Sequence, residues 1–212
     1  MSRLDILIVA FVAVCAGLAA LVALRTEMTR ARGGKILAFV ALFLLPALSV
    51  WAGLSTQMER ATTTTFCLSC HVMTDYGRSL LVDDPSYIAA AHFQNNRIPR
   101  DRACYTCHTT YALFGSVRAK IHGARHVYVQ YFGTVPAPDK IRLYDPYNNR
   151  ECLHCHDGAR KFEEMSAHVK TPQMLGDIKS GRLSCMASRC HDTVHDVGTL
   201  ADPDVKFWKS SF

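Results

Sequence analysis

The sequence has few charged and few aromatic residues, and no cluster of basic residues. Charged side chains make up 20% of the chain and aromatic ones 9%, and the net charge of +6 is spread along it. A nucleic-acid surface needs lysine and arginine gathered on one face, so this composition argues against a nucleic-acid partner. Cysteine, in contrast, is abundant. There are nine, and their spacing must distinguish disulfides, metal sites and cofactor attachment.

Two long stretches lack charge entirely. Residues 6–24 and 36–58 contain no Asp, Glu, Lys or Arg, and each reaches the length of about 20 residues that a helix needs to cross a bilayer. Buried helices of soluble proteins are rarely apolar on every face over such a length. We therefore predict a transmembrane hairpin with spans at about residues 5–24 and 36–56, in which Pro46 kinks the second helix without breaking it.

The loop between these runs, residues 25–35, predicts their orientation. It contains four basic residues and one acidic residue: Arg25, Glu27, Arg30, Arg32 and Lys35. The positive-inside rule places such a loop in the cytoplasm and both chain ends in the periplasm of a bacterial inner membrane. A cleaved signal peptide fits less well, because Arg3 is followed at once by Asp5 and no small-residue cleavage site precedes the loop.

Three later segments share the pattern C-x-x-C-H, the attachment signature of c-type haem. These motifs are Cys67, Cys70 and His71; Cys104, Cys107 and His108; and Cys152, Cys155 and His156. Two thiols bond to the two vinyl groups of one haem, and the next residue, a histidine, can then reach the iron. We include a fourth site with four residues between its cysteines, because the longer loop can bulge outward: Cys185, Cys190 and His191.

Zinc is the main alternative, since paired cysteines also build zinc sites. Zinc does not require a histidine directly after each second cysteine, as all four motifs here have. Eight of the nine cysteines are used by the four motifs, which leaves none to spare for disulfides. The ninth, Cys15, falls in the first apolar run and is interpreted as a small buried residue.

Four irons need up to eight axial ligands. Besides the attachment histidines, the candidate ligands are Met73, as a sulfur ligand, and six further histidines: His92, His122, His126, His154, His168 and His195. With four haems in roughly 150 residues, few of these positions can lie far from an iron.

Residues 65–73 resemble the first haem motif, C-x-x-C-H-x-M, of the NapC/NirT/NrfH family of membrane quinol dehydrogenases. The likeness continues through His92, the second motif, residues 114–121, residues 150–152 and a histidine after the fourth motif. It covers about residues 65–195, together with the second apolar run as the family's membrane anchor. The first apolar run is an addition, because the family usually has one anchor.

The resemblance implies a set of iron ligands. For haem 1 it points to Met73 in place of His71; two residues so close in sequence approach the same haem face, so they are alternatives and not a pair. The remaining implied pairs are His108 with His168 for haem 2, His156 with His195 for haem 3, and His191 with His92 for haem 4.

The resemblance also suggests where quinol would bind. Lys120 falls where the family places a lysine implicated in quinol binding. The family's acidic residue near haem 1 corresponds to His126 or Val127, which is a departure. His126 has a titration range suited to accepting a quinol proton, or it could bind haem 1 as a sixth ligand and close the site. His122 lies four residues earlier on the same helical face and could take either role.

Between the motifs the sequence indicates short helices and loops, with residues 109–132 as the best helical candidate. We therefore expect a mainly α protein. Residues 1–60 would form the two-helix transmembrane hairpin, and residues 61–212 a compact, loop-rich periplasmic cytochrome c domain with four covalent haems.

The expected function is electron transfer from menaquinol or ubiquinol, near haem 1, through four haems to a periplasmic or membrane-bound redox protein. One alternative stays open: an electron-relay subunit of a larger respiratory or photosynthetic complex, without its own quinol site. The additional helix and the His126 departure favour that alternative. The sequence does not decide whether the chain is a quinol-oxidising enzyme or a pure electron carrier.

Overall fold

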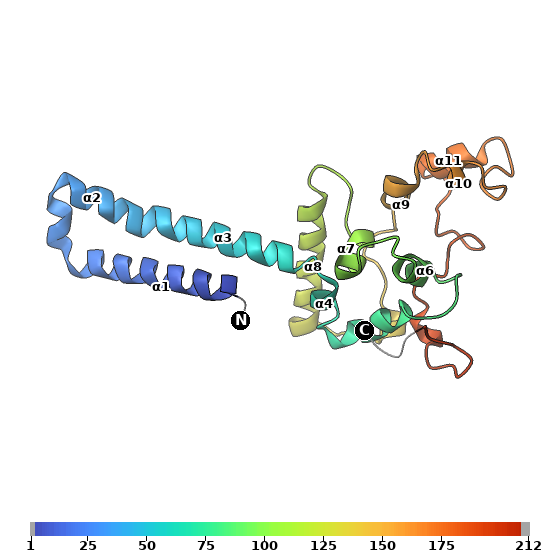
Figure 1. Cartoon of the computed structure of the whole chain (residues 1–212), viewed down its shortest axis with the longest axis horizontal. Coiled ribbons are helices and arrows are strands. Elements are labelled where there is room, and N and C mark those ends of the chain that lie inside the picture. Colours follow the sequence, from blue (N-terminus) through green and yellow to red (C-terminus); the bar gives the residue numbers. More distant parts are fainter. Residues whose placement is uncertain (1–2, 209–212) are drawn as a thin grey trace. The chain divides into compact units, whose positions relative to one another are not determined.

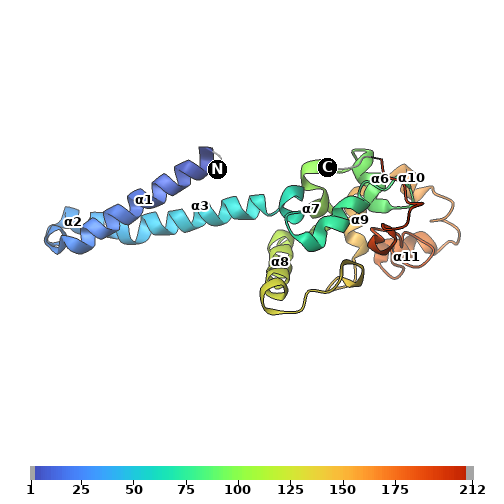
Figure 2. The same ribbon diagram turned by 90° about the horizontal axis from the view of Figure 1, so that it is seen from below.

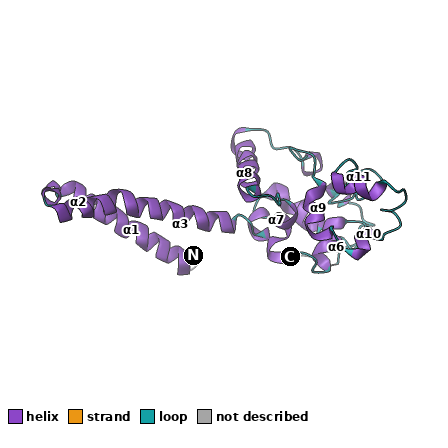
Figure 3. Ribbon diagram, turned by 90° about the horizontal axis from the view of Figure 1, so that it is seen from above, coloured by secondary structure: helices purple, strands orange, loops and turns teal. Residues whose placement is uncertain are grey.

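The computed structural model describes residues 3–208, which form helices joined by loops, with no β-strand in that range (Figures 1 and 3). This confirms the expected mainly α class. The chain divides into two compact units, Met1–Ala61 and Thr62–Phe212.

The N-terminal unit is a helical hairpin. Helix α1 (Arg3–Leu24) is followed by the short turn η1 (Thr26–Arg30), and a second helical segment returns beside α1: α2 (Arg32–Phe39), η2 (Val40–Leu44) and α3 (Leu45–Arg60). Residues Asp5–Leu24 and Arg32–Arg60 are long and apolar enough to cross a membrane. Most of their large apolar side chains are exposed, which suits a lipid surrounding.

Pro46 changes the second helix without ending it. The proline lies in the first turn of α3, directly after the wider π-helical turn η2. Proline has no N–H to donate and its ring collides with the carbonyl four residues earlier, so a locally wider turn accommodates it.

Polar contacts join the two arms of the hairpin. The Ser49 hydroxyl donates to the Leu45 carbonyl oxygen at 2.8 Å and lies 3.8 Å from the sulfur of Cys15, which is buried. At the open end of the hairpin, Arg60 forms an ion pair with Asp5. Cys15 is thus the buried packing residue that its position in an apolar run suggested.

The C-terminal unit consists of short helices and one longer one. In chain order they are α4 (Thr64–Cys67), η3 (His71–Met73), α5 (Thr74–Ser79), α6 (Ile88–Gln94), η4 (Arg100–Arg102), α7 (Ala103–Cys107), α8 (Gly115–Phe132), η5 (Pro138–Lys140), α9 (Asn149–His156), α10 (Arg160–Glu163), α11 (Met174–Ser180) and η6 (Val197–Thr199). Helix α8 begins six residues later than the predicted start at residue 109. Figure 2 shows the long loop after α8 that leads back to α9.

The apolar core of this unit is small. One buried cluster contains Leu80, Leu81, Ala89, Phe93 and Ala103, and a second contains Val82, Tyr87, Ala90 and Leu200. Phe207 packs against both clusters and so connects them. The Trp208 amide donates to the carbonyl of Leu81, a member of the first cluster, at 2.7 Å. So small a core leaves much of the unit to be held by other interactions.

Candidate haem centre

The second and third haem motifs lie in short helices, whereas the fourth lies in a loop between α11 and η6. Helix α7 carries Cys104 and Cys107, and helix α9 carries Cys152 and Cys155. Residues three apart lie on the same face of a helix, so both thiols of a motif can point to one side. In the first motif, α4 ends at Cys67 and Cys70 follows after a turn.

In the fourth motif, as in the second, the histidine amide is hydrogen-bonded to the carbonyl of the first cysteine, despite the longer loop. In the second motif the His108 amide donates to the Cys104 carbonyl at 2.9 Å, and in the fourth the His191 amide donates to the Cys185 carbonyl at 3.0 Å. The extra residues bulge outward, with Arg189 in the left-handed region at φ 69°. The histidine and the first cysteine are therefore brought together equally in both motifs.

The cysteines of different motifs meet in pairs. The Cys67 thiol is hydrogen-bonded to that of Cys104, and the Cys152 thiol to that of Cys185. The structure thus groups the first motif with the second and the third with the fourth.

A buried polar side chain fastens each of these two groups. The Thr64 hydroxyl donates to the Arg100 carbonyl at 2.7 Å and accepts from the Ala103 amide at 2.8 Å. The Asn149 side chain likewise donates to the Leu183 carbonyl at 2.7 Å and accepts from the Cys185 amide at 2.9 Å. Each lies three residues before the first cysteine of its group.

Six histidine rings form three pairs. The ring centres of His108 and His195 are 6.3 Å apart, with their planes 14° from parallel. Those of His92 and His156 are 6.0 Å apart at 81°, and those of His168 and His191 are 6.1 Å apart at 69°. A metal bound by two histidines lies about 2 Å from each coordinating nitrogen, which places the ring centres about 6 Å apart across the metal.

In each pair, the histidine that lies outside the haem motifs has its Nδ1 occupied. His92 Nδ1 lies 2.8 Å from the Ile88 carbonyl oxygen, and His168 Nδ1 lies 2.9 Å from the Phe162 carbonyl oxygen. Because a carbonyl only accepts, each Nδ1 carries the proton and leaves the Nε2 lone pair for a metal. His195 Nδ1 is held in the same way by the Ser79 hydroxyl at 2.7 Å.

The electrostatic surroundings favour neutral rings. Burial lowers the pKa of His108, His156 and His191, and it lowers the pKa of His195 to about 4, with the neighbouring His108 acting in the same direction. A histidine must be neutral to bind a metal, so these positions suit ligation.

Lys120 of α8 lies where the first two motifs meet, near Cys67 and Tyr105. Its amine is 4.7 Å from the centre of the Tyr105 ring. The pKa of the Cys67 thiol is lowered to about 7, chiefly by the hydrogen bond from Cys104, with the positive charge of Lys120 acting in the same direction. The Tyr105 hydroxyl oxygen is buried and has no hydrogen-bond partner within residues 3–208.

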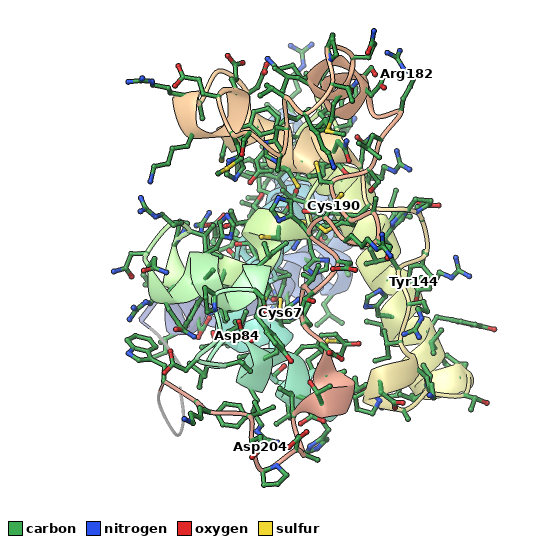
Figure 4. All side chains as sticks on the ribbon, turned by 90° about the vertical axis from the view of Figure 1, so that its right-hand side faces the viewer. Cys67, Asp84, Tyr144, Arg182, Cys190 and Asp204 are labelled. Carbon is green, nitrogen blue, oxygen red and sulfur yellow. The ribbon has the colours of Figure 1, made fainter. Side chains whose placement is uncertain are left out.

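His126 faces another part of the unit. Its ring makes an edge contact with Tyr144, with ring centres 5.1 Å apart, and Arg125 lies 4.1 Å from the centre of the same Tyr144 ring. Tyr144 lies close to α8 in Figure 4. Burial lowers the pKa of His126, with His122 and Arg125 acting in the same direction. The charge of His126 also contributes to the lowered pKa of His108, so it lies near the second motif.

Comparison with known proteins identifies the group of proteins to which these motifs belong. Residues 28–199 match the family described as NapC/NirT cytochrome c family, N-terminal region. The chain belongs to the NapC/NirT cytochrome c family. Membership of a cytochrome c family implies covalently bound haem, and the two apolar N-terminal helices are consistent with a membrane anchor.

The relatives differ in how much of the chain they cover. Cytochrome c-type protein NapC of Escherichia coli K12 is 29% identical over 119 residues, 50% of this chain and 56% of NapC, so the match spans about half of that relative's length. Denitrification system component NirT of Stutzerimonas stutzeri is 25% identical over 183 residues, 79% of this chain and 83% of NirT. A putative tetraheme cytochrome-c type protein of Allochromatium vinosum is 27% identical, covering 59% of this chain and 70% of its own length. No solved structure matches the chain.

The residues present fit the haem that this cytochrome family implies. Three pairs of histidine rings have their centres 6.0–6.3 Å apart, each pair contains one attachment histidine, and all nine cysteines are free of disulfides. Zinc fits less well, because in the described part of the chain no three His, Cys, Asp or Glu side chains converge on one point. The first motif differs from the others: His71 and Met73 lie together in η3, and both remain candidates for the first iron.

The observed histidine pairs differ from those that the resemblance implied. The expected partners of His108, His156 and His191 were His168, His195 and His92. The structure instead brings His195 to His108, His92 to His156 and His168 to His191. Both sets use the same six residues, and the pairs whose rings lie close together in this structure are taken as the proposed ligand pairs below.

Sequence reasoning also missed two residues of the site. Tyr105 was treated only as a variable position inside the second motif, and Ser79 was not singled out. An aromatic residue between two haem-binding cysteines is a usable signal for Tyr105. Ser79 has no such signal, because its partner His195 is distant in sequence.

Proposed function

We propose that this NapC/NirT-family protein is a membrane-bound tetrahaem cytochrome that takes electrons from membrane quinol and passes them to a periplasmic or membrane-bound redox protein. The observation that carries the proposal is the position of Lys120 where the first two haem motifs meet, close to Cys67 of the first and against Tyr105 of the second. As a quinol hydroxyl loses its proton, negative charge develops on its oxygen. An ammonium group at that point stabilises the charge.

The roles of the residues follow from their chemistry. Haem supplies the one-electron redox chemistry, while the protein sets its ligands and surroundings. Lys120 would hold the quinol oxygen by a charge-assisted hydrogen bond, and the unpartnered Tyr105 hydroxyl offers a second donor. Methionine ligation by Met73 would give the first iron a higher potential than a histidine pair, which makes it the better electron acceptor.

His126 has less structural support as a quinol residue. It contacts Tyr144 and lies near His108, whereas Lys120 lies near Cys67 of the first motif and contacts Tyr105 of the second. We therefore place Lys120 and Tyr105 at the quinol site and leave His126 as a second candidate, either for accepting the proton or for binding the first iron.

The alternative is an electron-relay subunit of a larger membrane complex, without a quinol site. The additional helix α1 favours this reading, because it enlarges the membrane surface available to other subunits. The absence of a carboxylate at positions 126 and 127 favours it as well.

Quinol reduction distinguishes the two functions. We expect menaquinol or ubiquinol analogues to reduce the purified protein rapidly, and Lys120→Ala to slow this about tenfold, as for losing one hydrogen bond to a charged group. The measurement is stopped-flow absorbance of the haem band in detergent or liposomes. Lys161→Ala, at an exposed lysine of α10, is the matched control and should keep the wild-type rate. If intact four-haem protein is not reduced, the relay function is supported instead.

Tyr105→Phe tests the second donor separately. It removes one hydroxyl that has no partner in the described structure, so the free energy of unfolding should not fall. Quinol reduction should nevertheless slow down. An unchanged rate would remove Tyr105 from the site while leaving Lys120 in it.

The revised iron ligands make a spectroscopic prediction. Nearly parallel imidazole planes at a low-spin ferric iron split the iron d orbitals widely and give a rhombic EPR signal. Nearly perpendicular planes give a highly anisotropic one. We expect His195→Ala to abolish a rhombic signal, because its ring is 14° from that of His108. His92→Ala and His168→Ala should each abolish an anisotropic signal, given angles of 81° and 69°.

Mass spectrometry provides the control for these spectra. Each variant must still carry four haems, since the attachment cysteines are unchanged. A mass increment of three haems in the wild type would show instead that Cys185 and Cys190 do not form a site. Loss of an anisotropic signal in His195→Ala would contradict the pairing with His108.

A further inference from the structure

The three distal histidines are held by different acceptors. His92 and His168 each donate Nδ1–H to a backbone carbonyl, of Ile88 and Phe162 respectively. His195 alone of the three donates to a side chain, the hydroxyl of Ser79, at 2.7 Å. A carbonyl cannot be removed by substitution, whereas a hydroxyl can.

The direction of the Ser79 hydrogen bonds is fixed by its surroundings. The Ser79 hydroxyl donates its only hydrogen to the Tyr76 carbonyl at 2.7 Å, so it must accept from His195 Nδ1–H. Ser79 is completely buried, with 0% of its surface exposed. No solvent acceptor can therefore replace it.

Tyr76 completes this clamp on His195. Its ring makes an edge contact with the His195 ring, with ring centres 5.3 Å apart, and its hydroxyl donates to the Pro138 carbonyl at 2.8 Å. Both Tyr76 and Ser79 belong to α5, which begins at Thr74 directly after Met73. One short helix therefore links the ligand segment of the first motif to the ligand of the second.

We propose that Ser79 is a positioning residue that lowers the redox potential of the second haem, by holding the Nδ1–H of His195. The proposal rests on the ligand pair His108–His195 of the proposed function. A hydrogen bond from Nδ1–H makes the imidazole a stronger donor through Nε2, which stabilises the ferric iron over the ferrous one. Removing the acceptor should therefore raise the potential.

The test is an EPR-monitored redox titration of the full-length protein in detergent. In Ser79→Ala we expect the midpoint of the rhombic signal to rise while the anisotropic signals keep theirs. If losing this outer hydrogen bond weakens ligation of ferric iron about tenfold relative to ferrous iron, the midpoint of this one-electron couple rises by about 59 mV. Ser79→Cys keeps the shape but is a weak acceptor, so it should also raise the midpoint and serves if Ser79→Ala assembles fewer than four haems.

Two controls separate this effect from packing. Ser180→Ala removes a serine that makes the same kind of bond, to the Asp177 carbonyl three residues earlier at 3.2 Å, but at an exposed site. It should leave every midpoint unchanged. Ser79→Thr keeps the hydroxyl and should keep the wild-type midpoint.

The outcomes distinguish this inference from the function on which it rests. If His195→Ala keeps the rhombic signal, the ligand assignment is wrong. If His195→Ala abolishes that signal and Ser79→Ala leaves its midpoint unchanged, the assignment stands and the role of Ser79 is refuted.

Discussion

At the scale of single residues, buried polar side chains define the haem unit more sharply than its apolar core does. Thr64 satisfies a carbonyl and an amide next to the second motif, and Asn149 does the same next to the fourth. A buried backbone group without a partner is costly. Each of these side chains therefore fixes the position of one motif relative to its neighbour.

Thr64→Val tests this role because the two side chains have similar shapes. The substitution leaves the Arg100 carbonyl and the Ala103 amide without their partner. We expect the free energy of unfolding to fall by about 2 kcal/mol, which is within the usual cost of leaving buried polar groups without hydrogen-bond partners. Denaturant unfolding followed by haem absorbance measures it. Thr65→Val, at an exposed neighbour bonded only to Thr63, should change little, and equal losses in both variants would contradict the argument.

At the scale of elements, the start of α8 depends on a glycine. A Cβ atom on Gly115 would lie 1.5 Å from the Thr110 carbonyl oxygen, so no other residue fits without moving the preceding loop. That loop is fastened to α9, because the Tyr111 amide donates to Glu151 at 2.9 Å and the Tyr111 ring stacks on His154. Gly115 therefore fixes where α8, and with it Lys120, begins.

Gly115→Ala should consequently displace α8. We expect a loss of about 1–3 kcal/mol in the free energy of unfolding, as for other overpacked sites, together with slower quinol reduction. Gly123→Ala is the matched control in the same helix, since its Cβ would meet nothing within 4 Å. Alanine is the better helix former, so the control should be neutral or stabilising. The same loss in both variants would rule out the close approach as the cause.

The elements also show what a sequence can and cannot predict. The apolar runs and the motif spacing depend on local chemistry, so the helical class followed from them. The later start of α8 did not, because it depends on a contact between Gly115 and Thr110. The ligand pairs could not be derived from spacing, since distal histidines are chemically equivalent until the fold places them. His92 has a local partner four residues away, but Ser79 and His195 are 116 residues apart.

At the scale of the whole molecule, the two units have different sources of stability. The N-terminal unit is apolar on its outer surface and suits a lipid surrounding. The C-terminal unit has two small clusters, and Phe207 packs against both of them. Histidines distant in sequence meet in pairs within it, so metal ligation would supply cross-links that its apolar core cannot replace.

The orientation of the two spans in the membrane can be tested directly. The loop between the two spans carries four basic residues against one acidic residue, which argues for a cytoplasmic loop, with both chain ends in the periplasm. We expect alkaline phosphatase fused after residue 62 to be active and a fusion after residue 30 to be inactive. The intact mass of the purified protein serves as the control, because removal of the first span as a signal peptide would leave the chain shorter by that span. An active fusion at residue 30 would instead place the loop in the periplasm, and the haem motifs, one span later, on the cytoplasmic side.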